Sequence, residues 1–159
     1  MTTTIERAQT DADFAASARM MFESEPWITL QRPYERCLAA VSDPGRELYV
    51  ARADSRVTGF VLLTMKGQFP GYIAILCVAP DARGTGLGTQ LIAFAESRIY
   101  QESPNVFICV SSFNHGARRL YERLGFQYVG ALTNYIVEGH DELLYRKTIG
   151  PLSTFTPAP

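Results

Sequence analysis

The chain has 159 residues, of which 47% are hydrophobic and 19% charged, and its formal net charge is -1 at pH 7. This length and composition are typical of one globular domain of a soluble protein. The nearly balanced charge argues against nucleic acid as a partner. No apolar run approaches the roughly 18 residues that cross a bilayer, and residues 1–7 lack the basic and then apolar layout of a signal peptide, so no membrane association is expected.

The cysteines and histidines predict neither a disulfide framework nor a metal site. The three cysteines (Cys37, Cys77 and Cys109) have no paired spacing, and the two histidines (His115 and His140) are far apart in the sequence. We interpret the cysteines as small buried side chains. Free cysteines suit a reducing compartment, so we expect a cytoplasmic protein.

The first 45 residues predict a short strand and two helices. Residues 2–8 fit the strand, and Thr10 can cap a first helix whose apolar residues recur at helical spacing. Pro26 ends this helix. Pro33 suits the first turn of a second helix, and residues 42–45 form a turn.

The middle of the chain predicts three strands and a helix. Residues 47–53 and 57–65 fit two strands of a hairpin. Residues 72–78 are almost wholly apolar, which is typical of a central strand. A glycine-rich loop then leads into a helix at residues 89–100, which buries Leu91, Ile92, Ala95 and Ile99.

The last third predicts one more strand and helix, followed by further strands. Residues 105–110 are an apolar strand, Asn114 can cap the next helix, and Gly125 ends it. The further strands are expected near residues 127–130 and in one or two strands through 135–137 and 142–147. Residues 150–159 hold three prolines and predict an extended or disordered tail.

The element order is therefore β-α-α-β-β-β-α-β-α-β-β. Two strand–helix units within a mostly antiparallel run predict an α/β fold with a mixed sheet and helices on both of its faces. We assign residues 1–149 to this single domain.

The glycine-rich loop at residues 78–89 is the segment most informative about chemistry. Pro80 breaks the central strand, and alternating glycines lead into a helix. Glycine lets the backbone approach a ligand closely, and the amide N–H groups at a helix start favour phosphate. Arg83 adds a positive charge. A tight strand-to-helix connection, with glycines only for geometry, is the alternative.

Two other phosphate-binding loops fit less well. A P-loop needs a lysine after its second glycine, and neither Gly86 nor Gly88 is followed by one. A dinucleotide-binding loop places its third glycine three residues after the second and an acid at the end of the next strand. Here the third glycine comes two residues later, and residues 106–113 contain no acid.

Two motifs resemble the GNAT superfamily of acyl-CoA-dependent N-acyltransferases. Arg83, Gly86 and Gly88 match its hallmark of Arg or Gln, two residues, Gly, one residue, and Gly or Ala. The segment from Asn114 to Phe126 is similar to a later motif of that family, and the resemblance covers residues 47–149 well. It implies the acyl-CoA N-acyltransferase fold and an N-acetyltransferase that uses acetyl-CoA as its co-substrate and no metal.

The resemblance also implies a role for particular residues. Strands 72–78 and 105–110 would splay apart, so that the pantetheine arm pairs with the backbone between them. Strands paired along their whole length would contradict the assignment. Asn114 would bond the arm while capping its helix, and Tyr121 would protonate the departing thiolate. The pyrophosphate would lie on the amides of Arg83, Gly84, Thr85, Gly86, Leu87, Gly88 and Thr89, and the arm on Leu76, Cys77 and Val78.

The group that deprotonates the acceptor amine stays open. The chain is similar to the ribosomal-protein alanine acetyltransferase branch through its C-terminal residues, but that branch has a glutamate base five residues before the motif asparagine. This chain has Cys109 there, and a neutral thiol is a poor substitute. The candidates are a chain of water molecules and the side chains of Glu23, Glu25, Glu138, His140 and Tyr72.

Three functions are compatible with these residues. The leading hypothesis is acetylation of a small-molecule amine or an amino-acid-like metabolite, and the second is acetylation of a peptide or protein amine. The third is a non-catalytic acyl-CoA sensor. Similar proteins are often homodimers. The acceptor pocket could be lined by Trp27, Tyr34, Tyr72 and Tyr135.

Overall fold

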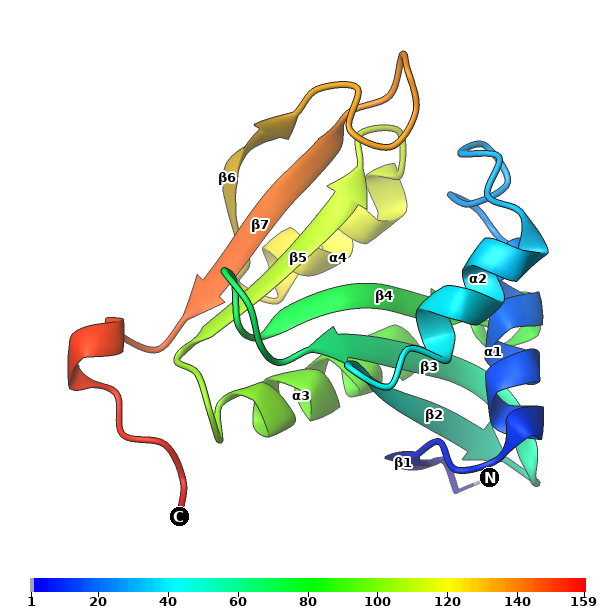
Figure 1. Cartoon of the computed structure of the whole chain (residues 1–159), viewed down its shortest axis with the longest axis horizontal. Helices are drawn as coiled ribbons and strands as arrows, with labels where there is room; N and C mark the ends of the chain where they lie inside the picture. The colour runs from blue at the N-terminus through cyan, green and yellow to red at the C-terminus, as the bar shows by residue number, and fades with distance from the viewer. Residues whose placement is uncertain (1) are drawn as a thin grey trace.

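The computed structural model describes residues 2–159 and contains a seven-stranded mixed sheet in the order β1-β2-β3-β4-β5-β7-β6 (Figure 1). The predicted element order and fold class are confirmed. The strands are β1 (Thr4–Arg7), β2 (Glu47–Ala53), β3 (Arg56–Thr64), β4 (Tyr72–Val78), β5 (Asn105–Ser111), β6 (Gln127–Leu132) and β7 (Glu142–Thr148). The helices are α1 (Asp11–Phe22), α2 (Tyr34–Val41), α3 (Leu87–Ile99) and α4 (His115–Arg123), with short 3-10 turns η1 (Pro80–Ala82) and η2 (Leu152–Thr154).

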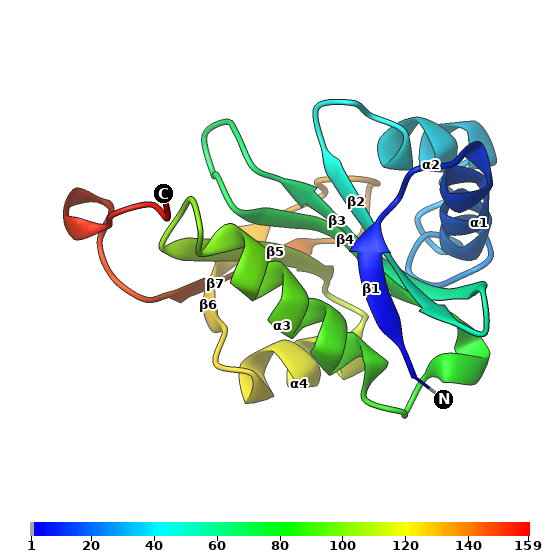
Figure 2. The same ribbon diagram turned by 90° about the horizontal axis from the view of Figure 1, so that it is seen from below.

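The sheet separates two apolar cores because strand side chains alternate between its faces. In β3, Val61 and Leu63 pack with α3 and α4, whereas Phe60 and Leu62 pack with α1 and α2. Figures 1 and 2 show these two helix pairs on opposite sides of the sheet. No helix within residues 2–159 is long and apolar enough to cross a membrane.

Strands β4 and β5 diverge after a short parallel contact. Only Tyr72 and Ile73 of β4 are paired with β5. On the other side of β4, Leu62 pairs with Ile75 and Leu63 with Ile73, so Ala74 is an extra residue and forms a bulge. Because a bulge bends its strand, β4 turns away from β5 at this point. The predicted separation of the two strands is confirmed.

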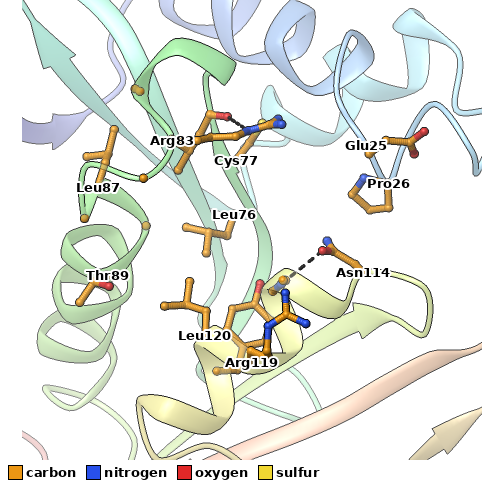
Figure 3. Close-up of a pocket in the computed structure, with 18 of the residues that line it drawn as sticks. Glu25, Pro26, Leu76, Cys77, Arg83, Leu87, Thr89, Asn114, Arg119 and Leu120 are labelled. Atoms are coloured by element: carbon orange, nitrogen blue, oxygen red, sulfur yellow. Dashed lines mark hydrogen bonds between the residues drawn. The ribbon is translucent and has the colours of Figure 1, made fainter.

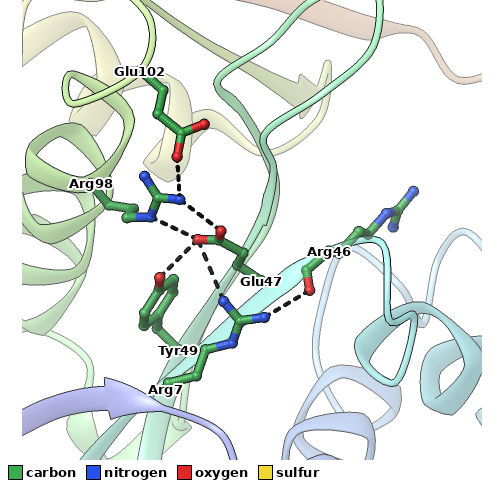
Figure 4. Close-up of polar contacts among 6 residues, drawn as sticks. All are labelled: Arg7, Arg46, Glu47, Tyr49, Arg98 and Glu102. Carbon is green, nitrogen blue, oxygen red and sulfur yellow. Dashed lines mark hydrogen bonds and ion pairs between the residues drawn. The ribbon is translucent and has the colours of Figure 1, made fainter. Parts of the chain in front are cut away.

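An ion-pair network fixes the C-terminal part of α3 to the sheet (Figure 4). Arg98 donates two hydrogen bonds to the carboxylate of Glu47, at 2.9 and 2.8 Å, and one to Glu102 at 2.7 Å. Tyr49 donates a further bond to Glu47, and Arg7 lies 3.5 Å from the same carboxylate. Burial raises the pKa of Glu47, but the Arg98 and Tyr49 hydrogen bonds outweigh it and the pKa is lowered.

Three local predictions need correction or refinement. Residues 135–137 are not a strand but belong to the β6–β7 loop, where Asn134, with φ +50°, accepts a hydrogen bond from the Gly139 amide at 2.8 Å. Such a side-chain-to-backbone hydrogen bond stabilises a turn and competes with the backbone hydrogen bonds that pair strands. Helix α3 begins two residues earlier than predicted. The tail contains the turn η2, and its Ala158 amide donates to the Gln101 carbonyl at 2.8 Å.

Candidate active site

A cavity of about 760 Å³ opens where β4 and β5 diverge (Figure 3). The glycine-rich loop, the first turn of α3 and helix α4 surround it, and the segment after α1 closes one side. The lining residues are Glu25, Pro26, Trp27, Leu76, Cys77, Val78, Ala82, Arg83, Gly84, Gly86, Leu87, Gly88, Thr89, Asn114, Gly116, Ala117, Arg119, Leu120, Tyr121 and Arg123. Of the predicted site residues, all except Thr85 line this cavity.

The first turn of α3 presents unused donors to this cavity. Gly84 and Gly86 have φ values of +73° and +87°, in the left-handed region that glycine adopts without strain. Gly86 is the N-cap and has no side chain to cap the helix. The amides of residues 87–89 therefore lack helical acceptors. A helix start of this kind favours an anionic ligand.

The peptide groups of β4 alternate in direction. The Ala79 amide donates to the Thr58 carbonyl of β3 at 2.9 Å, so Ala79 and Cys77 turn their peptide groups to β3. Leu76 and Val78 must then turn theirs into the gap that β5 leaves. The carbonyl of Val78 agrees with this direction, because it accepts a hydrogen bond from Arg83 Nε at 3.2 Å.

Cys77 is a core side chain. It is 4% exposed and packs with the α1–α2 core. Burial raises its pKa to about 12, so the thiol stays protonated at neutral pH. A reactive thiolate at this position is therefore unfavourable.

Asn114 and Tyr121 place polar groups at the far side of the gap. Asn114 caps α4, as predicted, and its side-chain oxygen accepts from the Ala117 amide at 3.3 Å. Tyr121 is 5% exposed. Burial, with a smaller effect of Glu142, raises the pKa of Tyr121 above its ordinary value. The phenol is therefore fully protonated at neutral pH.

A second cavity, of about 110 Å³, adjoins the first and shares Pro26, Trp27, Leu76, Asn114 and Tyr121 with it. The segment after α1 and the β6–β7 loop border this smaller cavity. Its remaining lining residues are Leu30, Arg32, Tyr72, Ile73, Ala74, Ile75, Ile108, Cys109, Val110, Ser111, Tyr135, Ile136 and Glu142. Tyr121 thus stands at the junction of a large and a small cavity.

Residues 9–126 match the model of the acetyltransferase (GNAT) family. The chain belongs to this family. An uncharacterized N-acetyltransferase of Methanocaldococcus jannaschii is 35% identical over 101 residues, which cover 62% of this chain and 64% of that protein. The mycothiol acetyltransferase of Mycobacterium leprae is 30% identical over 133 residues, covering 75% of this chain and 38% of that protein. The matched part of the chain therefore spans about two thirds or less of the length of these relatives.

Solved structures of the GNAT family share the fold. An aminoglycoside 6'-N-acetyltransferase complexed with coenzyme A has a TM-score of 0.76 at 15% identity, over 95% of this chain and 98% of that one. The ribosomal-protein alanine N-acetyltransferase of Escherichia coli has a TM-score of 0.75 at 18% identity, over 98% and 99%.

The GNAT motifs in this sequence locate the large cavity but only part of the small one. Among the suggested bases, Tyr72 lines the small cavity and Glu25 the large one, whereas Glu23, Glu138 and His140 line neither. Trp27 and Tyr135 also line the small cavity, as predicted, but Tyr34 does not.

Four charged residues that line these cavities were not predicted, and Arg32 of the small cavity is one of them. Arg119 and Arg123 are exposed on α4 and line the large cavity at an i, i+4 spacing. Glu142 lines the small cavity. Its sequence signal was an acid at the first position of an otherwise apolar strand segment, Glu142 to Tyr145.

Proposed function

We propose that this protein transfers an acetyl group from acetyl-CoA to the primary amine of a small molecule or an amino-acid-like metabolite. The observation that carries the proposal is the gap between β4 and β5, which joins unused helix-start amides at one end to a small second cavity at the other. A cytoplasmic location belongs to the same proposal, because all three cysteines are free.

The large cavity has the features needed for the donor. The amides of residues 83–89 and the guanidinium of Arg83 would hold the pyrophosphate, and Arg119 and Arg123, which line the same cavity, would add positive charge. The peptide groups of Leu76 and Val78 would pair with the extended pantetheine arm, as an added strand does. The family relative complexed with coenzyme A supports this donor.

The chemistry would take place beside Tyr121. The amine attacks the thioester carbonyl, and a peptide N–H of β4 stabilises the oxyanion that forms. When the tetrahedral intermediate collapses, the phenol of Tyr121 protonates the leaving thiolate. A general acid of this kind contributes about a hundredfold or more.

The small cavity favours a small acceptor. Its volume of about 110 Å³ fits an ammonium on a short stem better than a peptide segment. Arg32 lines the cavity, and within residues 2–159 no carboxylate lies in ion-pair distance of it. A carboxylate on the acceptor would supply that partner, which supports an amino-acid-like metabolite.

A peptide amine is the second candidate function. Tyr135 and Ile136, on the rim of the small cavity, are 65% and 45% exposed, and such exposed apolar groups could contact a longer acceptor. The likeness to a ribosomal-protein acetyltransferase supports the same alternative, at the level of fold.

Release of free thiol from acetyl-CoA, measured with a panel of amines, tests the proposal. The panel contains ethylamine, glycine, lysine, tyramine and a short peptide with a free N-terminus. We expect the small amines to be acetylated faster than the peptide, and Tyr121→Phe to lower kcat about a hundredfold while CoA affinity stays within about twofold. Tyr128→Phe, at a 56% exposed position of β6, is the matched control and should behave as wild type.

The panel also separates the alternatives. Fastest turnover with the peptide would favour the second candidate. CoA binding without thiol release for any amine would support a non-catalytic acyl-CoA sensor and contradict the proposed transfer.

A further inference from the structure

Glu142 is a buried acid in the small cavity, and the chemistry described so far does not use it. It is the first residue of β7 and lies opposite Ser111 of β5. The next residue, Leu143, points into the α3–α4 core, so Glu142 faces the other side of the sheet, where the small cavity lies. The side chain is only 6% exposed.

The carboxylate of Glu142 has no counter-charge. Its Oε1 accepts a hydrogen bond from Ser111 Oγ at 2.5 Å. In the part of the chain that the structure describes, no lysine, arginine or histidine nitrogen lies within the 4.0 Å of an ion pair with this carboxylate. A buried carboxylate without a counter-charge is unfavourable, because burial removes its hydration. A cationic ligand in the cavity would remove much of that cost.

The groups that face Glu142 leave its charge uncompensated. Burial raises the pKa of Cys109 and of Tyr121, and the carboxylate of Glu142 raises them further. These groups are neutral at pH 7. Arg32 lines the same cavity, but Glu142 is not among the groups that shift its pKa: burial and the like charges of Arg46 and Arg36 lower that pKa, and Cys37 opposes them. The titratable groups around this cavity are Tyr72, Cys109, Tyr121, Tyr135 and Arg32.

We propose that Glu142 is the catalytic base, whose carboxylate binds the ammonium group of the acceptor and removes its proton before attack. This inference rests on the proposed function and names the recognition element of the acceptor, a primary ammonium. Cys109 lies on the same face of β5 as Ser111, two residues before it, so the carboxylate absent from position 109 is supplied by the neighbouring strand.

The proton balance of the step is complete. One N–H bond of the ammonium breaks, and its proton passes to Glu142 and then to water. The freed lone pair forms the C–N bond to the thioester carbon. The C–S bond then breaks, and the sulfur takes the proton of the Tyr121 phenol. The resulting phenolate is reprotonated by the second proton that the attacking nitrogen loses. The products are the acetylated amine, free CoA and one proton in solution.

The substitution Glu142→Gln tests this role because it keeps the size of the side chain and an acceptor for Ser111. With the best amine of the panel, we expect kcat/KM at pH 7 to fall about a hundredfold or more, while CoA affinity stays within about twofold. Burial raises the pKa of Glu142, only partly offset by the Ser111 hydrogen bond. Wild-type activity should therefore rise with pH through a carboxyl group that titrates above its ordinary range, and the variant should lose this acidic limb.

Two controls separate a base from a structural residue. Hydroxylamine is already neutral at pH 7, so its acetylation should be far less sensitive to Glu142→Gln than that of an alkylamine. Glu138→Gln changes an exposed acid of the β6–β7 loop that lines neither cavity and should leave both rates unchanged.

The outcomes distinguish the inference from the function beneath it. If wild type acetylates no amine, the proposed function fails. If wild type is active and Glu142→Gln matches it at every pH, or slows hydroxylamine equally, the role of Glu142 is overturned while the transferase stands. If Glu142→Gln does not fold, Glu142→Asp decides. If Glu142→Asp keeps the acidic limb of the pH profile at a reduced kcat/KM, the role of Glu142 as the base is supported. If Glu142→Asp has the wild-type rate but lacks that limb, the role is overturned.

Discussion

Asp13 connects helix α1 to the sheet and completes the helix cap. Its Oδ2 accepts from the amides of Gln9 and Thr10 at 3.0 and 3.1 Å, and the Thr10 hydroxyl accepts from the Asp13 amide at 3.2 Å. Arg52 of β2 donates to Oδ1 of the same carboxylate. Asp13 is 4% exposed, so its charge depends on these partners.

We predict that Asp13→Asn destabilises the protein in a pH-dependent way. Burial raises the pKa of Asp13, but hydrogen bonds from Gln9, Arg52 and Thr10 outweigh it and lower the pKa to about 2, from 3.8. The carboxylate therefore stabilises the fold fully above pH 4, and the effect is lost as the pH falls toward 2. We expect the substitution to cost about 2 kcal/mol of unfolding free energy at pH 7, measured by urea denaturation, and much less near pH 2.5.

Asp11→Asn is the matched control for this prediction. Asp11 lies in the same first turn but is exposed and makes only the helix-dipole interaction. We expect Asp11→Asn to lower the free energy of unfolding by about 0.5 kcal/mol. An equal loss for both variants, or a loss from Asp13→Asn that does not change with pH, would show that the hydrogen-bonded charge is not the cause.

At the scale of elements, the start of α3 depends on a left-handed residue. Gly86 has φ +87°, so Gly86→Ala introduces strain although no atom lies within 4 Å of the added Cβ. We expect a loss of about 1 kcal/mol of unfolding free energy and roughly tenfold weaker CoA binding, because the donor amides of residues 87–89 shift. Thermal denaturation and calorimetric titration with CoA measure the two effects.

Gly150→Ala is the control for Gly86→Ala. Gly150 lies outside both cavities, has no left-handed φ and also has free space at its Cβ position. It should change stability by less than about 0.5 kcal/mol and leave CoA binding unchanged. Unchanged CoA affinity in Gly86→Ala would mean that the loop does not position the donor amides.

The elements were largely predictable because they follow from local patterns. Alternating side chains gave the strands, helical spacing gave the helices, and Asn114 and Gly125 marked the limits of α4. Residues 135–137 were wrongly predicted to be a strand, because apolar residues such as Tyr135 and Ile136 also occur in an exposed turn. Glu142 was missed because a strand position does not reveal whether its face of the sheet meets solvent or a cavity.

At the scale of the molecule, the sheet consists of two parts with little backbone pairing between them. β1 to β4 form one part and β5 to β7 the other, and the link is the short β4–β5 pairing together with the Gly71 carbonyl, which accepts from the Phe107 amide at 2.9 Å. A Cβ at Gly71 would lie 2.4 Å from the Asn105 carbonyl oxygen, so the two parts approach closely at this point.

We predict that CoA protects alternate amides of β4 from hydrogen exchange. The amides of Leu76 and Val78 face the gap and should exchange quickly in the free protein, then much more slowly with CoA. The amides of Ile75 and Cys77 already face β3 and should be protected in both states. Exchange measured residue by residue by NMR gives this contrast. A uniform slowing of all four amides would indicate general stabilisation by binding and not strand-like pairing in the gap.

The arrangement of the cavities could not be predicted from local patterns. Pro26 and Trp27, which follow α1, reach the same cavities as Tyr121, almost a hundred residues later in the chain. Only the packing of α1 and α2 on one face of the sheet brings them there. The resemblance to a family supplied the gap and the donor, because those features follow motifs. The small cavity is lined largely by segments outside the motifs, and only Asn114 and Tyr121 come from the second motif.

The bulge at Ala74 has a consequence for how this protein can change over evolutionary time. Because the gap that it opens offers main-chain groups, substitutions at positions 76 and 78 would leave the proposed donor contacts in place. The small cavity, by contrast, is lined by side chains from several separate segments of the chain. Under the proposed function, changes in the side chains that line only the small cavity would alter the accepted amine while the main-chain contacts to the donor stay the same. The two cavities share Pro26, Trp27, Leu76, Asn114 and Tyr121, so changes at those positions would affect both.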